Sequence, residues 1–404
     1  MSYLSILGRP GVLPVVLAMM VSRLNIGING LAVLLYVGDQ TGSFATAGLA
    51  SGAIALGMAA GGPLQSRFVD DSGIRVLNLA ACAYVAGMLG VWLLGDQDGL
   101  LLPLLLAALV AGASVPSTSA VLRSRWPDLL SERPDATKAA YALDSVLIQI
   151  LVVIGPLVTA AAVAWTGIEG ALAFSMGSAL VGTLVFTALL RADVGRGGGR
   201  PTSILHLGAL ASPGLRTLIN ASVPLGFFIG AVEVALPAYA EEIGDPELAG
   251  VLLAVFAGAS IVAGLLYGAR STRASLGSIH RALSALLPII CLPLVFAESE
   301  AAVIVLAAIG GLPVSPLIAS RNELVNVVSV PGRAAESFSW PLTAMIVGIS
   351  LGAAAGGALA DAHGWSAAVL AAVGAAAAGA GLLLLQSRRL DAPDPEAVAA
   401  EGRS

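Results

Sequence analysis

Long apolar runs recur along this chain and constrain its fold more than any other feature. A membrane-spanning helix needs about 20 mostly apolar residues, whereas a membrane-spanning strand alternates polar and apolar residues over about 10 positions. The runs here are longer than such strands and show no alternation. The sequence therefore predicts an all-α polytopic membrane protein with twelve transmembrane helices, at residues 12–37, 44–65, 76–95, 100–122, 138–164, 169–190, 214–240, 247–268, 279–297, 300–319, 334–360 and 365–387.

The amino-acid composition excludes a large soluble protein. Of the 404 residues, 57% are hydrophobic and 11% are charged, whereas soluble domains carry about 25% charged residues. The first apolar run follows Arg9, as the apolar part of a signal peptide would. That run is too long for a signal peptide, and many similar runs follow it. We therefore expect it to remain in the protein as the first span.

The basic residues predict the orientation of the chain in the membrane. Lysine and arginine collect in cytoplasmic loops, and nineteen of the twenty basic residues, Arg123 and Arg321 included, fall in alternate loops or at the chain ends. The remaining loops are neutral or acidic, as at 95–99 and 241–247. We therefore expect a multi-pass protein of the cytoplasmic (inner) membrane with both termini in the cytoplasm. The twentieth basic residue, Arg23, lies inside the first span.

The spans divide six and six around a basic, glycine-rich segment. We expect an N-terminal six-helix half at 1–190, a cytoplasmic linker at 191–213, a C-terminal half at 214–387 and a disordered cytoplasmic tail at 388–404. The two halves resemble each other, because Gly112, Pro116, Arg123 and Ala140 run in the same order as Gly311, Pro316, Arg321 and Ala335. Internal repeats of this kind are typical of secondary transporters, whose binding site lies between the repeats.

A short motif follows the second span. In GPLQSRFVDDSGIRVL (62–77), Asp70, Gly73 and Arg75 fall in one tight turn. An acid and a base there can bond to neighbouring helix ends and latch one arrangement of the halves, although a solvated turn would also account for them. The motif, the twelve spans, the basic central loop and the two similar halves resemble the major facilitator superfamily over essentially the whole chain. Ser66 and Asp71 depart from the family pattern, which has a glycine and a base at these positions.

The resemblance implies secondary active transport by alternating access, with spans 1, 4, 7 and 10 around a central cavity and spans 2, 5, 8 and 11 beside them. Ala108 replaces the arginine that proton-driven drug exporters carry four residues before Gly112, whereas Gly155 and Pro156 keep part of an exporter motif. We expect proton-coupled efflux of a small organic molecule. A nutrient or metabolite importer of the same fold, and a non-transporting membrane scaffold or sensor, are the alternatives.

Three ionisable residues lie well inside predicted spans, namely Arg23, Asp144 and Glu233. Such residues are costly in a bilayer, are functional candidates and need partners. The predicted spans thus contain one arginine for two carboxylates. A buried carboxylate without a neighbouring cation favours its protonated form. Our hypothesis is that Arg23 holds Asp144 while Glu233 carries the proton or a cationic substrate. The reverse assignment and a static buried pair are the alternatives.

Other polar residues lie on spans that the resemblance places at or beside the cavity. They are Asn25, Asn29, Ser114, Thr118, Tyr141, Glu336, Trp340 and Thr343. Polar groups within spans often serve to join helices, but Trp340 offers an aromatic face to an organic substrate. Glu336 falls at the inner entrance of its span, where solvation alone would account for it.

The sequence gives no sign of other chemistry. It lacks the Gly-x-x-x-x-Gly-Lys-Ser/Thr sequence that binds nucleotide phosphates, its three histidines are scattered, and its two cysteines lie in apolar runs. The bases are spread along one face of the membrane, which does not indicate a nucleic-acid partner. We therefore expect no enzyme activity, catalytic residue, cofactor or metal. We expect a monomer whose partners are its small-molecule substrate, protons and the lipid bilayer.

Overall fold

The computed structural model describes residues 6–41, 44–95, 100–130, 134–190, 208–245, 248–270 and 274–386. Within these ranges the secondary structure is helical. The elements are α2 (Val12–Thr41), α3 (Phe44–Ser72), α4 (Val76–Leu94), α5 (Leu101–Ala113), α6 (Thr118–Leu129), α7 (Pro134–Leu190), η1 (Gly208–Ala211), α8 (Pro213–Glu242), α9 (Leu248–Ala269), α10 (Leu276–Cys291), η2 (Leu292–Phe296), α11 (Glu300–Gly311), α12 (Val314–Val328), α13 (Ala334–His363) and α14 (Trp365–Leu385). The tail predicted at 388–404 and most of the predicted linker lie outside the described residues.

The described helices confirm an all-α membrane protein. Eleven helical segments are long and apolar enough to cross a membrane, when α5 and α6, α10 and η2, and α11 and α12 are each counted as one segment. The fifth and sixth predicted spans are joined in α7, which is 57 residues long and turns at Gly167. Gly167 has φ 75° and ψ 177°, a conformation that glycine adopts easily because it has no Cβ. The turn therefore falls where the sequence predicts the loop between these two spans.

The fourth and tenth predicted spans are each broken, and each continues beyond its predicted end. A break separates α5 from α6, and a second break separates α11 from α12. Because α6 and α12 extend to Leu129 and Val328, Arg123 and Arg321 are buried, with exposed fractions of 0% and 2%. Their predicted place in cytoplasmic loops is wrong. A charged residue ends an apolar run in the sequence, but it does not end a helix whose surroundings are protein.

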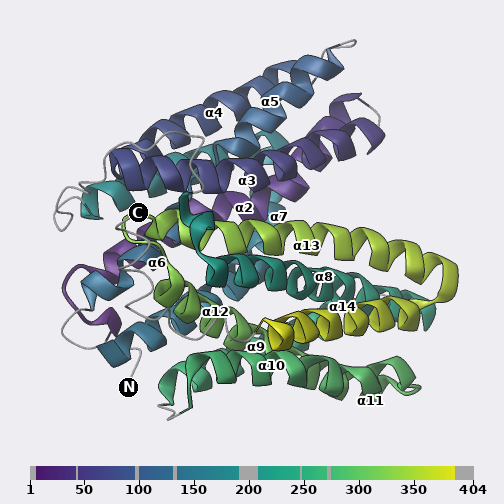
Figure 1. Ribbon diagram of the computed structural model, residues 1–404. Helices are drawn as coiled ribbons and strands as arrows, with labels where there is room; N and C mark the ends of the chain where they lie inside the picture. Colours follow the sequence, from purple (N-terminus) through teal and green to yellow (C-terminus); the bar gives the residue numbers. More distant parts are fainter. Residues whose placement is uncertain are drawn as a thin grey trace.

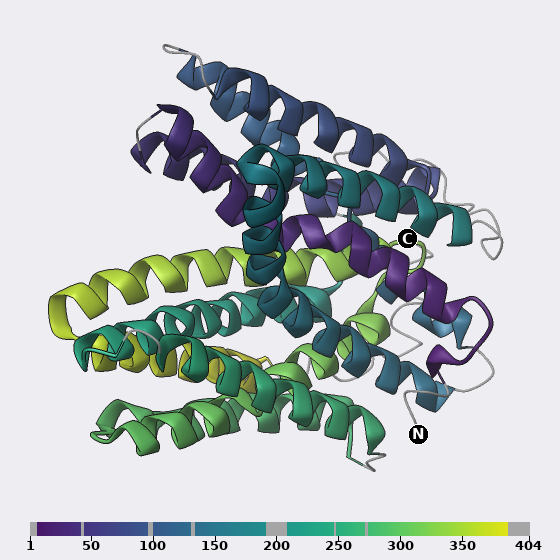
Figure 2. The same ribbon diagram turned by 180° about the vertical axis from the view of Figure 1, so that it is seen from behind.

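Two groups of helices make up the bundle, and we call α2–α7 the N half and α8–α14 the C half. In Figure 1 the two groups lie closest together at the end of the bundle that holds both N and C, and they diverge toward the other end. Figure 2 shows α7 bending across the back of the molecule. Its contacts reach α2 and α4 in the N half and α9 and α12 in the C half. α3 and α13 form the other main contact between the halves.

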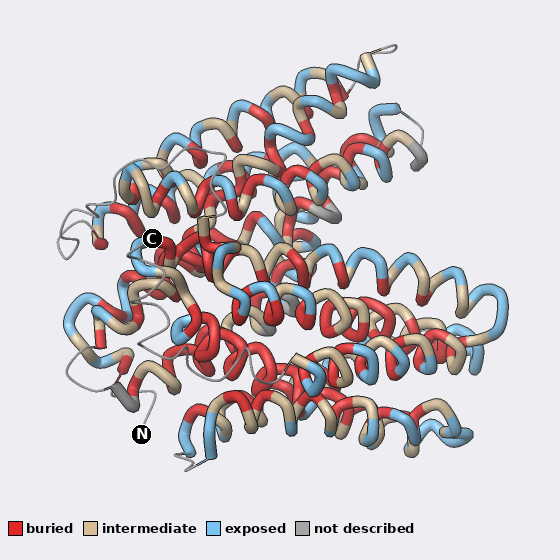
Figure 3. The backbone as a smooth tube through the Cα atoms, viewed as in Figure 1, coloured by how far each residue is buried: buried red, intermediate tan, exposed pale blue. Residues whose placement is uncertain are grey.

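The helices pack closely inside and expose apolar side chains outside. Glycines let helices approach at the α8–α13 contact, where a Cβ at Gly226 or Gly348 would overlap the partner backbone. Large side chains such as Leu56, Leu79 and Trp165 are 69%, 72% and 86% exposed. Figure 3 shows buried residues gathered between the helices and exposed residues along the outer faces. This distribution suits a protein surrounded by lipid, where apolar groups have no reason to avoid the surface.

Candidate functional site

A cavity of about 360 Å³ lies between the two halves. This volume is within the range of about 300–1,000 Å³ that small-molecule sites occupy. From the N half it is lined by Arg23, Ile26, Gly27, Met58, Gly62, Val115, Pro116, Ser117, Ser119, Ala120, Ile148 and Leu151, and from the C half by Ser339, Leu342, Thr343, Met345, Ile346 and Ile349. The lining combines an apolar surface with a few polar groups, as a site for an organic molecule requires.

Arg23 supplies the charge of this cavity. It lies on α2 and is 8% exposed. Among the described residues that line the cavity, Arg23 is the only charged one. None of the described carboxylates forms an ion pair with it. Arg123 and Asp144 are nevertheless close enough to exert Coulomb interactions on Arg23. The cavity therefore has a buried cation at its wall without a bonded counter-charge from the described part of the chain.

Asp144 pairs with Arg123 instead of Arg23. The Arg123 Nε and Asp144 Oδ2 atoms are 2.5 Å apart, and both side chains are buried. Tyr141, one turn before Asp144, donates its hydroxyl to the Arg123 carbonyl at 3.3 Å. The hypothesis that Arg23 holds Asp144 is therefore wrong for this conformation. Its physical reason is the length of α6, which carries Arg123 into the protein interior beside α7.

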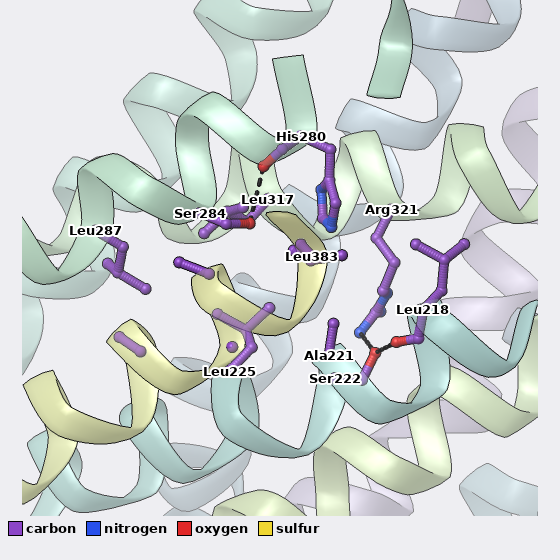
Figure 4. Close-up of a pocket in the computed structure, with 13 residues that line it drawn as sticks. Leu218, Ala221, Ser222, Leu225, His280, Ser284, Leu287, Leu317, Arg321 and Leu383 are labelled. Atoms are coloured by element: carbon purple, nitrogen blue, oxygen red, sulfur yellow. Dashed lines mark hydrogen bonds between the residues drawn. The ribbon is translucent and has the colours of Figure 1, made fainter. Parts of the chain in front are cut away.

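Arg321 occupies the equivalent place in the C half, but it has no carboxylate partner among the described residues. Its Nη1 donates to Ser222 Oγ at 3.3 Å and to Met345 Sδ at 3.4 Å. Figure 4 shows it at the edge of a small pocket, with leucines around the rest and His280 nearby. That pocket has about 20 Å³ of space, which is enough for a single water. It is a buried polar spot and is too small for an organic molecule.

Glu233 lies on α8 and is partly buried. No ion pair joins it to a described basic residue, and it does not line the 360 Å³ cavity. The structure therefore does not bring Glu233 to Arg23, although the sequence analysis placed them on opposite walls of one cavity. Its role in coupling stays a hypothesis.

The motif after the second span joins the two halves. The Asp70 carboxylate at the end of α3 accepts the backbone N–H groups of Ala335 and Glu336, at 3.2 and 2.9 Å, in the first turn of α13. Asp71 forms an ion pair of 2.9 Å with Arg333. A carboxylate at a helix N-terminus satisfies N–H groups that have no acceptor within the helix. We call these contacts of Asp70 and Asp71 with α13 the latch.

The other two motif residues act within the turn. Gly73 has φ 88°, which suits glycine at the bend between α3 and α4. Arg75 is exposed and makes no side-chain cap at the start of α4. The acid of the motif therefore forms contacts between the halves, and its glycine shapes the turn.

α3 and α13 meet along positions spaced by about one helical turn. Residues 62, 66 and 70 of α3 face residues 343, 339 and 335 of α13. A Cβ at Gly62 would lie 3.6 Å from Thr343 Oγ1, and the hydroxyls of Ser66 and Ser339 hydrogen-bond to each other. These α3–α13 contacts run from Gly62, which lines the cavity, to Asp70 in the latch. The latch therefore holds the two halves together at one end of the cavity.

A protein-family comparison agrees with this architecture. The family described as Major Facilitator Superfamily matches residues 15–297 and 218–403. The chain belongs to the major facilitator superfamily. No curated protein sequence matches it.

Solved structures of this superfamily share its fold at low sequence identity. A bacterial homologue of the iron transporter ferroportin, in an outward-facing state, superposes with a TM-score of 0.75 at 16% identity and covers 93% of this chain and 98% of its own. The human organic anion transporter MFSD10 gives 0.67 at 15% identity, covering 95% and 100%. The E. coli fucose:proton symporter FucP (N162A) gives 0.64 at 14% identity, covering 95% and 100%. These likenesses show the fold.

Several predicted polar residues of this superfamily member join helices. Asn29 Oδ1 accepts hydrogen bonds from the hydroxyls of Tyr84 and Ser175, at 2.8 and 2.6 Å. Asn25 is fully buried on the same helix. Thr118 Oγ1 donates to Ser22 Oγ at 3.5 Å. These contacts tie α2 to α4, α6 and α7 within the N half.

The remaining predicted polar residues are divided between the cavity and its surroundings. Thr343 lines the cavity, whereas Ser114 caps the end of α5 with its backbone N–H. Trp340 Nε1 donates to Glu336 Oε1 at 3.5 Å, and Trp340 does not line the cavity in this conformation. Glu336 is 2% exposed, so solvation does not account for it. It lies beside Arg333, 3.8 Å from the Arg333 guanidinium.

Sequence reasoning missed the buried roles of Arg123 and Arg321 and the Ser66–Ser339 contact. The repeat had already aligned the two arginines, since each follows a proline on a corresponding span. That alignment was the signal available in the sequence. The serine contact had no such signal, because a serine pair between distant helices leaves no pattern in one sequence.

Proposed function

We propose that this protein is a secondary active transporter that moves a small organic molecule across the cytoplasmic membrane by alternating access. The observation that carries the proposal is the latch, which joins the halves at one end of a cavity that both halves line. A latch between two rigid halves stabilises one conformation, and its release lets the other form. The solved relatives are named as transporters of an organic anion, iron and fucose, which supports transport of a small solute.

The charge pattern supports an orientation for the latch. If basic loops are cytoplasmic, both termini and the latch face the cytoplasm. The conformation described here is then closed toward the cytoplasm. This agrees with its likeness to the ferroportin homologue, which is described as outward-facing. We propose that, while the latch is closed, the cavity exchanges substrate with the outside of the cell. An importer would take up its substrate in this state, and an exporter would release it.

We further propose proton coupling and export. Asp144 and Glu233 are carboxylates within apolar helices, and one of them carries the proton through the transport cycle. FucP is named as a proton symporter, so this fold supports such coupling. Gly155 and Pro156 in α7 favour export.

The proposal is tested by locking the halves. In a background with Cys82→Ser and Cys291→Ser, the double variant Ser66→Cys/Ser339→Cys places two thiols where two hydroxyls now touch. The protein is reconstituted in liposomes and tested with 2-naphthalenesulfonate, 2-naphthalenesulfonamide and trimethyl(2-naphthyl)ammonium, which we call the naphthyl panel. We expect uptake of at least one member above protein-free liposomes, its loss on oxidation and its return on reduction.

A disulfide within one half is the matched control. Ser260 and Ser315 both belong to the C half, and their hydroxyl oxygens are 2.8 Å apart. Oxidised Ser260→Cys/Ser315→Cys should transport as before, because the halves still move relative to each other. Uptake that continues through the oxidised Ser66–Ser339 link would contradict alternating access. A panel without any link-sensitive uptake would favour the scaffold.

A further inference from the structure

We infer that the transported molecule is an organic anion whose acidic group binds between Arg23 and the first turn of α6. The inference rests on the proposed function, and it names the class of substrate. It follows from three features of the cavity, namely an uncompensated arginine, a helix N-terminus inside the membrane, and an excess of buried positive charge.

The first feature is Arg23. A buried cation without a counter-charge is costly, and Arg23 has no ion pair among the described residues although 92% of its surface is covered, since 8% is exposed. Asp144, the carboxylate that interacts electrostatically with Arg23, is bonded to Arg123. A bound anion would supply the missing counter-charge, and the cavity gives it access to Arg23.

The second feature is the break between α5 and α6. Ser119 and Ala120, in the first turn of α6, line the cavity. The N-cap residue Ser117 makes no side-chain cap to this helix and donates its hydroxyl to the Gly62 carbonyl at 3.3 Å instead. The Ser119 hydroxyl is buried and has no hydrogen-bond partner in the described part of the protein. Helix N-termini attract anions, and broken helices in transporters direct them at acidic substrate groups.

The third feature is the balance of buried charge. Arg23, Arg123 and Arg321 all interact electrostatically with Asp144 or with each other. Glu323 accepts a hydrogen bond from Tyr267 at 2.9 Å and is attracted electrostatically by Lys138. Because Asp144 neutralises Arg123, Arg23 at the cavity wall and Arg321 beyond it remain as buried cations without an ion pair among the described residues, and the field beside the cavity is positive. Such a field concentrates anions and repels cations.

The other residues that line the cavity indicate the chemical nature of the rest of the substrate. Ile26, Met58, Leu151 and Ile346 offer apolar surface, which favours an aromatic or branched hydrocarbon body over a sugar. The inferred substrate is therefore a carboxylate or sulfonate on an apolar frame of about the size of two fused rings.

Binding and uptake of the naphthyl panel test this inference, because its three members share one body and differ in charge. We expect the sulfonate to raise the melting temperature of the purified protein, measured by calorimetry, and the sulfonamide and ammonium compounds to leave it unchanged. Arg23→Gln should weaken sulfonate binding at least tenfold in isothermal titration. Arg216→Gln, a change at an exposed arginine on α8, should not.

A second variant covers the case in which Arg23→Gln fails to fold. Ser119→Asp places a carboxylate at a helix N-terminus, where it favours the helix, and opposes an incoming anion. Ser119→Asn is its neutral match. We expect sulfonate binding to be lost in Ser119→Asp and kept within a few-fold in Ser119→Asn.

The outcomes separate this inference from the proposed function. Uptake of the ammonium or sulfonamide compound in preference to the sulfonate, with or without Arg23, would overturn the anion site and leave transport standing. Sulfonate binding that depends on Arg23, without uptake of any member, would support the anion site and contradict transport. Failure of all three compounds to bind would contradict the inference as well.

Discussion

The two halves carry the same kinds of buried charge but arrange them differently. In the N half, Arg123 and Asp144 form a buried ion pair between α6 and α7. In the C half, Arg321 is bonded to Ser222 and Met345, and Glu233 has no ion pair with a described residue. The repeat that aligns Ala140 with Ala335 places Ser339 where the N half has Asp144. The arginine on α6 of the N half is therefore neutralised by a fixed pair, whereas the matching arginine on α12 of the C half has no carboxylate partner among the described residues.

Because of this difference, we expect the buried charges of the two halves to have different roles. A buried pair removes two charges from the field around the cavity and holds α6 against α7. Arg321 and Glu233 of the C half, like Arg23 at the cavity, have no such pair among the described residues and keep their charge or their proton. We therefore expect substitutions in the N-half pair to act on stability, and those in the C half to act on transport.

The largest expected effect is that of Asp144→Asn. Removal of one partner leaves Arg123 buried without a counter-charge, which costs about 3–5 kcal/mol in other proteins. The free energy of unfolding in mixed micelles measures this cost. A loss below about 1 kcal/mol would show that water or another group already compensates Arg123, and the contrast between the halves would fail.

Arg123→Gln/Asp144→Asn is the matched control for that variant. It removes both charges and should recover much of the stability, because no buried charge is left unpaired. If the double variant is as unstable as the single one, the loss comes from packing and not from the charge.

Asp70→Asn should have a smaller effect, on the balance between conformations. The amide oxygen still accepts one N–H of α13 but without the charge. Loss of a helix-end contact costs about 0.5–2 kcal/mol, which corresponds to a several-fold shift away from the latched state. Thiol labelling of Ser339→Cys, a position that is buried at the α3–α13 contact next to the latch, should become several times faster. An unchanged labelling rate would mean that the latch does not hold the halves together.

Arg321→Met should change stability by about 1 kcal/mol or less, because the arginine gives up two hydrogen bonds to neutral groups and no ion pair. The free energy of unfolding in mixed micelles compares it directly with Asp144→Asn. A loss as large as that of Asp144→Asn would show that Arg321 has a carboxylate partner in solution, and the two halves would be alike.

The smallest expected change in stability is that of Glu233→Gln, yet its transport should change in character. A glutamine has nearly the same shape but cannot take up a proton. We expect uptake of the transported panel member to lose its response to an imposed pH gradient, while binding is kept. Glu233→Asp, which retains the carboxyl, should keep that response. Unchanged proton dependence in Glu233→Gln would exclude this residue as the proton carrier and leave Asp144.

The sequence was sufficient for the architecture, because the features that define it are local. Apolar runs of the right length mark the spans, and the Asp70 motif predicts contacts with helix ends that the structure then shows. The partner of Asp144 was not predictable in the same way. A charge at Arg123 looks like the start of a loop unless the helix is known to continue inside protein, and this depends on tertiary packing. The cavity likewise depends on which faces of α2, α6 and α13 meet.

The central claim is that the halves open alternately at the two ends, and distances between spin labels test it most directly. In nanodiscs, with both native cysteines replaced, one pair of labels is placed at the latch end on Ser72 and Pro331. A second pair is placed at the other end on Leu101 and Asp361, and all four positions are exposed. We predict two distances for each pair, with the short distance at one end accompanying the long distance at the other, and a shift toward the open latch in Asp70→Asn. A single distance at each end that is unchanged by Asp70→Asn would contradict alternating access.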